Sequence, residues 1–267
     1  MFIAHASFVK LFPNVGMATN QRQDNILKAQ QAFYAENMDM AIVGTSLANR
    51  IIRDSIPNIQ SLAFVGCSVE DGLQILKSRH SAPKYVFVEI NLLLRGGRKE
   101  LVRGTTEGIL PKIKEWIPSL REQYEPICIL AYTIIGTSKM NIQAGMAVVD
   151  QKLLNSEVEE ALKENIAIEN NILERRMSYI KALTSEMEKK GTKFVFFEMP
   201  VNYQLTHLKM YDQIREAVRE YFPEGKYDYL PSDTSKYLTT DGQHLDFEGQ
   251  QRYTHFFKKA TSKYMNL

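Results

Sequence analysis

Two short stretches near opposite ends of the chain carry residue types suited to acyl transfer. Ser46 follows an apolar run and a glycine–threonine pair, and Asp241 and His244 stand three residues apart near the C-terminus. A serine hydroxyl is a weak nucleophile unless a base accepts its proton, and an imidazole oriented by a carboxylate is such a base. These three residues favour a serine hydrolase or acyltransferase.

The position of Ser46 along the chain fits this role. The apolar run 40–43 ends at Gly44, and a helical pattern begins directly after Ser46. In an open parallel sheet such a turn lifts a side chain to the carboxyl edge, where ligands bind. The free N–H groups of a helix N-terminus also favour developing negative charge. Gly66 and Asn91 follow the next two predicted strands, so the N–H groups of Ser46 and Gly66 and the amide of Asn91 could converge as oxyanion donors.

These positions resemble the four sequence blocks of the SGNH (GDSL-like) hydrolases. The resemblance implies Ser46 as nucleophile, His244 and Asp241 as its triad partners, and Gly66 and Asn91 as oxyanion donors beside the N–H of Ser46. It also implies a flavodoxin-like sheet of five parallel strands.

Two blocks depart from the family pattern. Thr45 stands where the first block usually has aspartate, and the third block, usually Gly-x-Asn-Asp, offers only Asn91. The pair of Asp241 and His244 is intact.

The chain is most similar to a divergent branch that includes alginate O-acetylation proteins and the D-alanyl transfer protein of teichoic acid. Members of this branch lie on the outer face of the membrane and move or remove acyl groups on envelope polymers. The resemblance implies an esterase or O-acyltransferase, an acylated carbohydrate as substrate, no cofactor, and an extracytoplasmic location (periplasm or outer membrane face). A cytoplasmic location is the alternative.

The pattern of apolar runs predicts a single α/β domain over residues 1–267. Strands are expected over 40–43, 61–65, 85–90, 193–197 and 227–230. Helical patterns over 23–37, 69–77 and 247–264 alternate with them. Strands that alternate with helices form parallel sheets with right-handed crossovers, so we expect a flavodoxin-like three-layer α/β/α fold with a central, mainly parallel five-stranded sheet.

A long helical insertion, about 104–190, separates the third and fourth predicted strands. It contains an expected helix near 107–122, an apolar stretch 127–135 and a long helical pattern over 156–190. Ser156 and Glu159 have the spacing of a capping box, and Gly191 is expected to stop the helix. The insertion either covers one face of the sheet, which we favour, or forms an arm for an envelope protein partner.

Composition and charge exclude several classes of function. With 33 basic and 31 acidic side chains the net charge is +2. The sequence has no basic stripe, so we do not expect it to bind nucleic acid. The histidines are scattered and Cys67 and Cys128 lack metal-ligand spacing, so we expect no metal. No apolar run approaches the roughly 18 residues of a membrane span. Residues 1–15 form either a surface arm or the remainder of an anchoring segment.

Other interpretations of the same residues stay open at this point. Glu89 and Glu198 each end an apolar strand. They could be the acid–base pair of a glycosidase or, more simply, could accept hydrogen bonds from loop N–H groups or a buried arginine. Ser46 could be only a helix cap, and Asp241 only part of a turn. The chain would then be a catalytically silent binding module of an envelope polysaccharide assembly.

Overall fold

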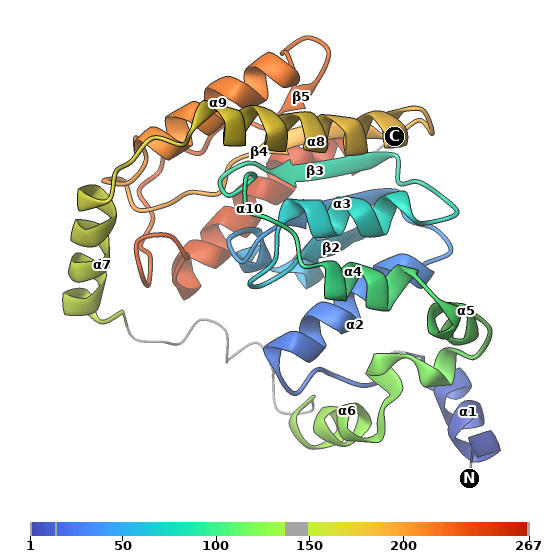
Figure 1. Cartoon of the computed structure of the whole chain (residues 1–267). Coiled ribbons are helices and arrows are strands. Elements are labelled where there is room, and N and C mark those ends of the chain that lie inside the picture. Colours follow the sequence, from blue (N-terminus) through green and yellow to red (C-terminus); the bar gives the residue numbers. More distant parts are fainter. Residues whose placement is uncertain (1, 14, 137–148, 266–267) are drawn as a thin grey trace.

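A computed structural model describes residues 2–13, 15–136 and 149–265 (Figure 1). Five parallel strands form a central sheet in the order β2-β1-β3-β4-β5. The strands are β1 Met40–Gly44, β2 Ile59–Ala63, β3 Tyr85–Glu89, β4 Lys193–Phe197 and β5 Asp228–Tyr229. The predicted flavodoxin-like three-layer fold is confirmed, and the second strand begins and ends two residues earlier than expected.

Helices surround this sheet and complete the outer layers (Figure 1). Their bounds are α1 Phe2–Leu11, α2 Gln21–Tyr34, α3 Val69–Lys77, α4 Lys99–Thr106, α5 Ile109–Trp116, α6 Pro126–Ala131, α7 Gln151–Lys163, α8 Asn170–Glu188, α9 Lys209–Tyr221 and α10 Phe247–Met265. Side chains of α2, α3, α8 and α9 join the core on one face of the sheet, and those of α10 join the core on the other.

Successive side chains of each strand point to opposite faces of the sheet, and both faces are buried. In β3, Val86 and Val88 point to the first core, whereas Tyr85 and Phe87 point to the second. Phe87 meets Phe257 of α10 with ring centroids 5.6 Å apart. A parallel strand covered on both faces is apolar almost throughout, which is the pattern that the sequence shows.

The insertion between β3 and β4 differs from the prediction in its helices. The long helix expected over 156–190 is wrong, because α7 and α8 are separate helices. The segment between them is bound to α9: the N–H of Ile168 donates to the Gln213 side chain, and the Asn165 side chain accepts from the N–H of Lys209. The expected capping box at Ser156 is also wrong. Asp150 caps α7, accepting from the N–H groups of Lys152 and Leu153, so Ser156 lies inside the helix.

Other parts of the insertion agree with the pattern only in part. The helix expected near 107–122 is present as α5 followed by short 3-10 turns, and the apolar stretch 127–135 forms α6 and a π-helical turn, Tyr132–Gly136. Gly191 follows α8 with φ +92°, a conformation that glycine adopts without strain, so the predicted stop is confirmed.

The helix α8 covers a face of the sheet, the role favoured for the insertion. Met177, Ile180, Leu183 and Met187 are buried in the first core. At the other end of the chain, Val9 of α1 is also buried, so this segment packs on the domain as a surface arm would. Among the described residues, no helix combines the length and apolar character needed to cross a membrane.

Two isoleucines of α8 test whether this helix is part of the folded core. Ile180 is fully buried and Ile172 is 38% exposed. We expect Ile180→Ala to lower the free energy of unfolding by about 2–5 kcal/mol, because it removes buried methyl groups and leaves a cavity. Ile172→Ala is the matched control, expected to change it by at most about 1 kcal/mol. Urea unfolding measures both, and equal small losses would contradict the assignment of α8 to the core.

Candidate active site

The turn that carries Ser46 lies at the carboxyl end of β1, an inner strand between β2 and β3. Thr45 and Ser46 directly follow Gly44, the last residue of that strand. Ser46 is partly exposed between neighbours that are buried on both sides. The turn therefore presents the Ser46 hydroxyl at the edge of the sheet where ligands of parallel α/β folds bind.

Three side chains form a continuous hydrogen-bonded row at this edge. His244 Nε2 lies 2.8 Å from Ser46 Oγ, and His244 Nδ1 lies 2.6 Å from Asp241 Oδ2. These distances are those of direct hydrogen bonds. The structure thus brings together the three residues that the sequence analysis singled out, in the order required for proton transfer from the serine hydroxyl.

The two oxygens of Asp241 make different contacts. Oδ2 meets the imidazole, while Oδ1 accepts from the backbone N–H groups of Gln243 and His244 at 3.0 and 2.8 Å. Burial alone would raise the pKa of Asp241, but the His244 side chain and these N–H groups outweigh it and lower the pKa to about 2. The carboxylate is therefore ionised at neutral pH, and it orients both the ring and the turn.

The loop that carries this pair is fixed at several points. Thr239 and Leu245 form an antiparallel bridge, and Leu245 is buried in the second core. Gly242 has φ +86°, and a Cβ atom there would lie 3.0 Å from Leu205 Cδ1 and 3.2 Å from Val158 Cγ2 of α7. Glycine is required by both the backbone conformation and the close approach of the insertion helix.

A buried carboxylate supports the turn beneath Ser46. Glu89 Oε2 accepts from the N–H groups of Thr45 at 2.7 Å and Ala48 at 3.2 Å, and the Thr45 hydroxyl lies 3.0 Å from both carboxylate oxygens. Burial raises the pKa of Glu89, while hydrogen bonds from Thr45, Ala48 and Leu92 oppose that rise. Glu89 therefore accepts hydrogen bonds from loop N–H groups, as the simpler interpretation expected.

The predicted oxyanion donors lie at the same edge with other partners. Asn91 follows β3, and its side chain pairs with the backbone of Met199: Nδ2 donates to the carbonyl at 2.9 Å and Oδ1 accepts from the N–H at 2.7 Å. Gly66 follows β2 with φ +72°, and its carbonyl accepts from Arg98 Nε at 2.8 Å. Among the described residues neither Asn91 nor Gly66 forms a hydrogen bond with Ser46, so their role as oxyanion donors stays a prediction.

The helix expected directly after Ser46 is wrong. Only a 3-10 turn, η1 Ala48–Arg50, follows, and the chain turns extended at Ile51. The N–H of Ile52 donates to the Thr254 hydroxyl of α10 at 3.0 Å instead of continuing a helix. The Ser46 turn therefore lacks a long helix dipole, and Glu89 accepts the N–H groups of Thr45 and Ala48 on either side of Ser46.

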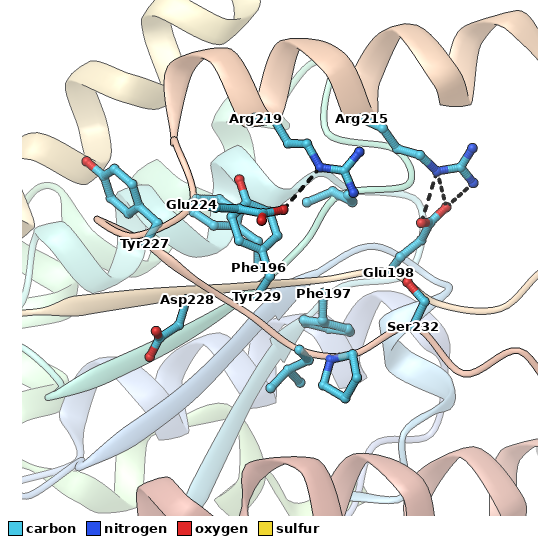
Figure 2. A pocket seen from close by; sticks show the side chains of 13 residues that line it. Phe196, Phe197, Glu198, Arg215, Arg219, Glu224, Tyr227, Asp228, Tyr229 and Ser232 are labelled. Carbon is cyan, nitrogen blue, oxygen red and sulfur yellow. Dashed lines mark hydrogen bonds and ion pairs between the residues drawn. The ribbon is translucent and has the colours of Figure 1, made fainter.

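The second strand-end glutamate has a different environment. Glu198 binds Arg215 of α9 through contacts of 2.5–3.2 Å, so it accepts from a half-buried arginine, the second of the simpler interpretations. The pair borders a hollow of about 490 Å³ at the ends of β4 and β5, where Arg219 meets Glu224 (Figure 2). Because both arginines are paired with carboxylates, this hollow offers little net positive charge to an anion.

Two residues near the row lie outside the set of site residues that the sequence predicts. Burial lowers the pKa of Arg50, and the negative charge of the nearby Asp241 carboxylate acts against this lowering. Its position four residues after Ser46 is the feature of the sequence that could have placed Arg50 near the site. Tyr211 of α9 is buried, its hydroxyl has no hydrogen-bond partner within the described part of the chain, and burial raises its pKa to about 12. No spacing in the sequence indicates that Tyr211 lies near the site.

Comparison with known proteins adds no family assignment. No protein-family model matches the chain, and no curated protein matches it. The function is therefore argued from the geometry of the site and from the residues that carry the sequence resemblance.

The low pKa of Asp241 predicts a pH-dependent contribution to stability. Its folded pKa of about 2 lies below the ordinary value of 3.8, so the stabilisation is present above pH 4 and is lost as the pH falls toward 2. Since the side chain is 40% exposed, solvent screening reduces the contribution to about 1–2 kcal/mol. We expect Asp241→Asn to lower the free energy of unfolding by this amount at pH 6 and by much less near pH 2, measured by urea unfolding.

The matched control is Asp39→Asn, which removes an exposed ion pair with Lys84. Exposed pairs contribute little, so this change should alter stability by at most about 1 kcal/mol at either pH. An equal deficit of Asp241→Asn at both pH values would contradict the assignment.

Proposed function

We propose that this protein is a serine esterase or O-acyltransferase that acts on small acyl groups, acetyl above all, of a carbohydrate or cell-envelope polymer. The observation that carries the proposal is the hydrogen-bonded row from Ser46 through His244 to Asp241, with distances of 2.8 and 2.6 Å. Nucleophile, base and orienting carboxylate in this order are the requirement for acyl transfer through a serine.

The proposed reaction has two halves. As Ser46 Oγ attacks the ester carbonyl carbon, His244 Nε2 accepts the hydroxyl proton and Asp241 stabilises the resulting imidazolium. The imidazolium then protonates the departing alcohol, which leaves an acyl group on Ser46. Water or a sugar hydroxyl attacks this ester in the second half, and His244 again accepts and returns the proton. Water gives hydrolysis and a sugar hydroxyl gives transfer.

The negative charge that develops on the carbonyl oxygen needs donors. The N–H groups of Ser46 and Gly66 and the amide of Asn91 are the proposed donors, as the resemblance to SGNH hydrolases implies. Asn91 Nδ2 carries two protons and uses one for the Met199 carbonyl, so it retains a second for this purpose. Each such donor typically contributes about 3 kcal/mol to the stability of the transition state.

The substrate class and location rest on the resemblance to the alginate and teichoic-acid branch. We propose an acylated carbohydrate polymer outside the cytoplasm, with an envelope protein partner docking through the insertion. A glycosidase built on Glu89 and Glu198 is not proposed, because Glu89 is fully buried and Glu198 is held by Arg215.

Covalent labelling tests the nucleophile directly. A fluorophosphonate probe should label the wild-type protein on Ser46, and Ser46→Ala should abolish the label, since the phosphorus–oxygen bond forms only at an activated hydroxyl. Ser232→Ala is the matched control: this exposed serine also follows a strand end, and its loss should leave labelling unchanged. Peptide mapping identifies the labelled residue. Absence of label on the wild type would favour the silent binding module.

The three residues should also act as a unit in turnover. With p-nitrophenyl acetate, we expect Ser46→Ala and His244→Ala each to lower kcat by about 10³-fold or more. The double variant should be no worse than the worse single variant, because either loss removes the same proton-transfer step. Steady-state rates of the four proteins measure this, and multiplicative losses would show that the two side chains act independently.

A further inference from the structure

We propose that Glu89 is a positioning residue that holds the Ser46 turn in its reactive conformation from the neighbouring strand. The effect of Glu89 on catalysis rests on the proposed function, whereas its effect on the conformation of the Ser46 turn rests on the geometry alone. Glu89 is the last residue of β3 and is fully buried, and its carboxylate lies under the chain segment that carries the candidate nucleophile.

The contacts of Glu89 lie on both sides of Ser46. Oε2 accepts the N–H of Thr45, the residue before it, at 2.7 Å, and the N–H of Ala48, two residues after it, at 3.2 Å. One oxygen atom thus fixes the backbone before and after the nucleophile. A hydrogen bond to each of these two N–H groups restricts the backbone on its own side of Ser46.

The threonine hydroxyl extends this arrangement. Thr45 Oγ1 lies 3.0 Å from both carboxylate oxygens and accepts the N–H of Leu47 at 3.3 Å. Because its lone pair faces Leu47, the hydroxyl directs its proton toward Glu89. The N–H of Leu92 is a further donor to the carboxylate. Glu89 therefore also links the Ser46 turn to the turn that follows β3 and begins with Asn91.

The sequence makes room for the carboxylate at Gly44. A Cβ atom at this glycine would lie 2.8 Å from Glu89 Oε2 and 2.5 Å from the Ala48 Cβ. Both distances are shorter than real Cβ atoms show, so any side chain would displace the carboxylate or the turn. The glycine before Thr45 is thus explained by the approach of Glu89 as well as by the end of the strand.

The consequence for chemistry follows from alignment. A hydroxyl that moves by about 1 Å from its base can lose about 10²-fold in rate. In Glu89→Gln one carboxylate oxygen becomes an NH₂ group of nearly the same size, which would face donors instead of accepting from them. We expect a 10- to 100-fold lower kcat with p-nitrophenyl acetate, an unchanged KM, and a similar fall in the rate of fluorophosphonate labelling.

The control is Glu198→Gln, the same change at the end of the adjacent strand, where the carboxylate binds Arg215 rather than the Ser46 turn. It should leave both rates within about twofold of wild type. A second pair of variants acts through Thr45: Thr45→Ser keeps the hydroxyl and should retain the rate, whereas Thr45→Val removes it and should lower the rate. This pair also serves if Glu89→Gln does not fold.

Amide hydrogen exchange separates this inference from the proposed function. In Glu89→Gln and Thr45→Val, exchange of the amides at positions 45 and 48 should accelerate while that of β4 and α8 is unchanged. If wild type is not labelled by the probe, the proposed function fails and exchange alone decides the role of Glu89. Rates and exchange both at wild-type values, or acceleration spread equally over the whole core, would overturn the inference.

Discussion

The hydrogen bond between His244 Nε2 and the Ser46 hydroxyl joins two turns that lie 198 residues apart in the chain. One hydrogen bond makes too small a net contribution to stability to position both turns, so each turn must be held by contacts of its own. The Ser46 turn is held from below by Glu89, and the Asp241–His244 loop is held by the burial of Leu245. The geometry of the candidate site therefore depends on the end of β3 and on the core that buries Leu245.

The electrostatic arrangement assigns the two acids near Ser46 to different tasks. Asp241 is partly exposed, binds the imidazole and has a lowered pKa. Glu89 is fully buried, binds backbone N–H groups, and has a raised pKa because burial disfavours its charge. Burying a carboxylate costs free energy unless its hydrogen bonds are satisfied, and the donors of the Ser46 turn satisfy them here. Stability of the core and alignment of the serine are linked through this one residue.

The insertion contributes to the fold and to the site in different ways. Its helix α8 supplies buried side chains to the first core, whereas α7 packs through Leu154 and Val158 on the chain that follows β4 and on Gly242. The insertion helix α7 thus lies against the loop of the candidate acid and base. Figure 1 shows it beyond the edge of the sheet, away from α1, α5 and α6. A segment that could be taken for a separate arm is part of the support of the site.

The sequence by itself determined the sheet, because strands buried on both faces are apolar throughout and end at glycine or polar residues, as β1 and β3 do. It also predicted that Ser46, Asp241 and His244 form one candidate site, since their types and places at strand ends or in a turn are local properties, and the three side chains are hydrogen-bonded to one another. The tertiary structure decided where α7 and α8 divide and that only a 3-10 turn follows Ser46, because hydrogen bonds to α9 and to Thr254 replace those of a helix. The partners of Glu89 and Asn91 were likewise fixed only when neighbouring strands came together, since sequence patterns record the period of an element but not the contacts between elements.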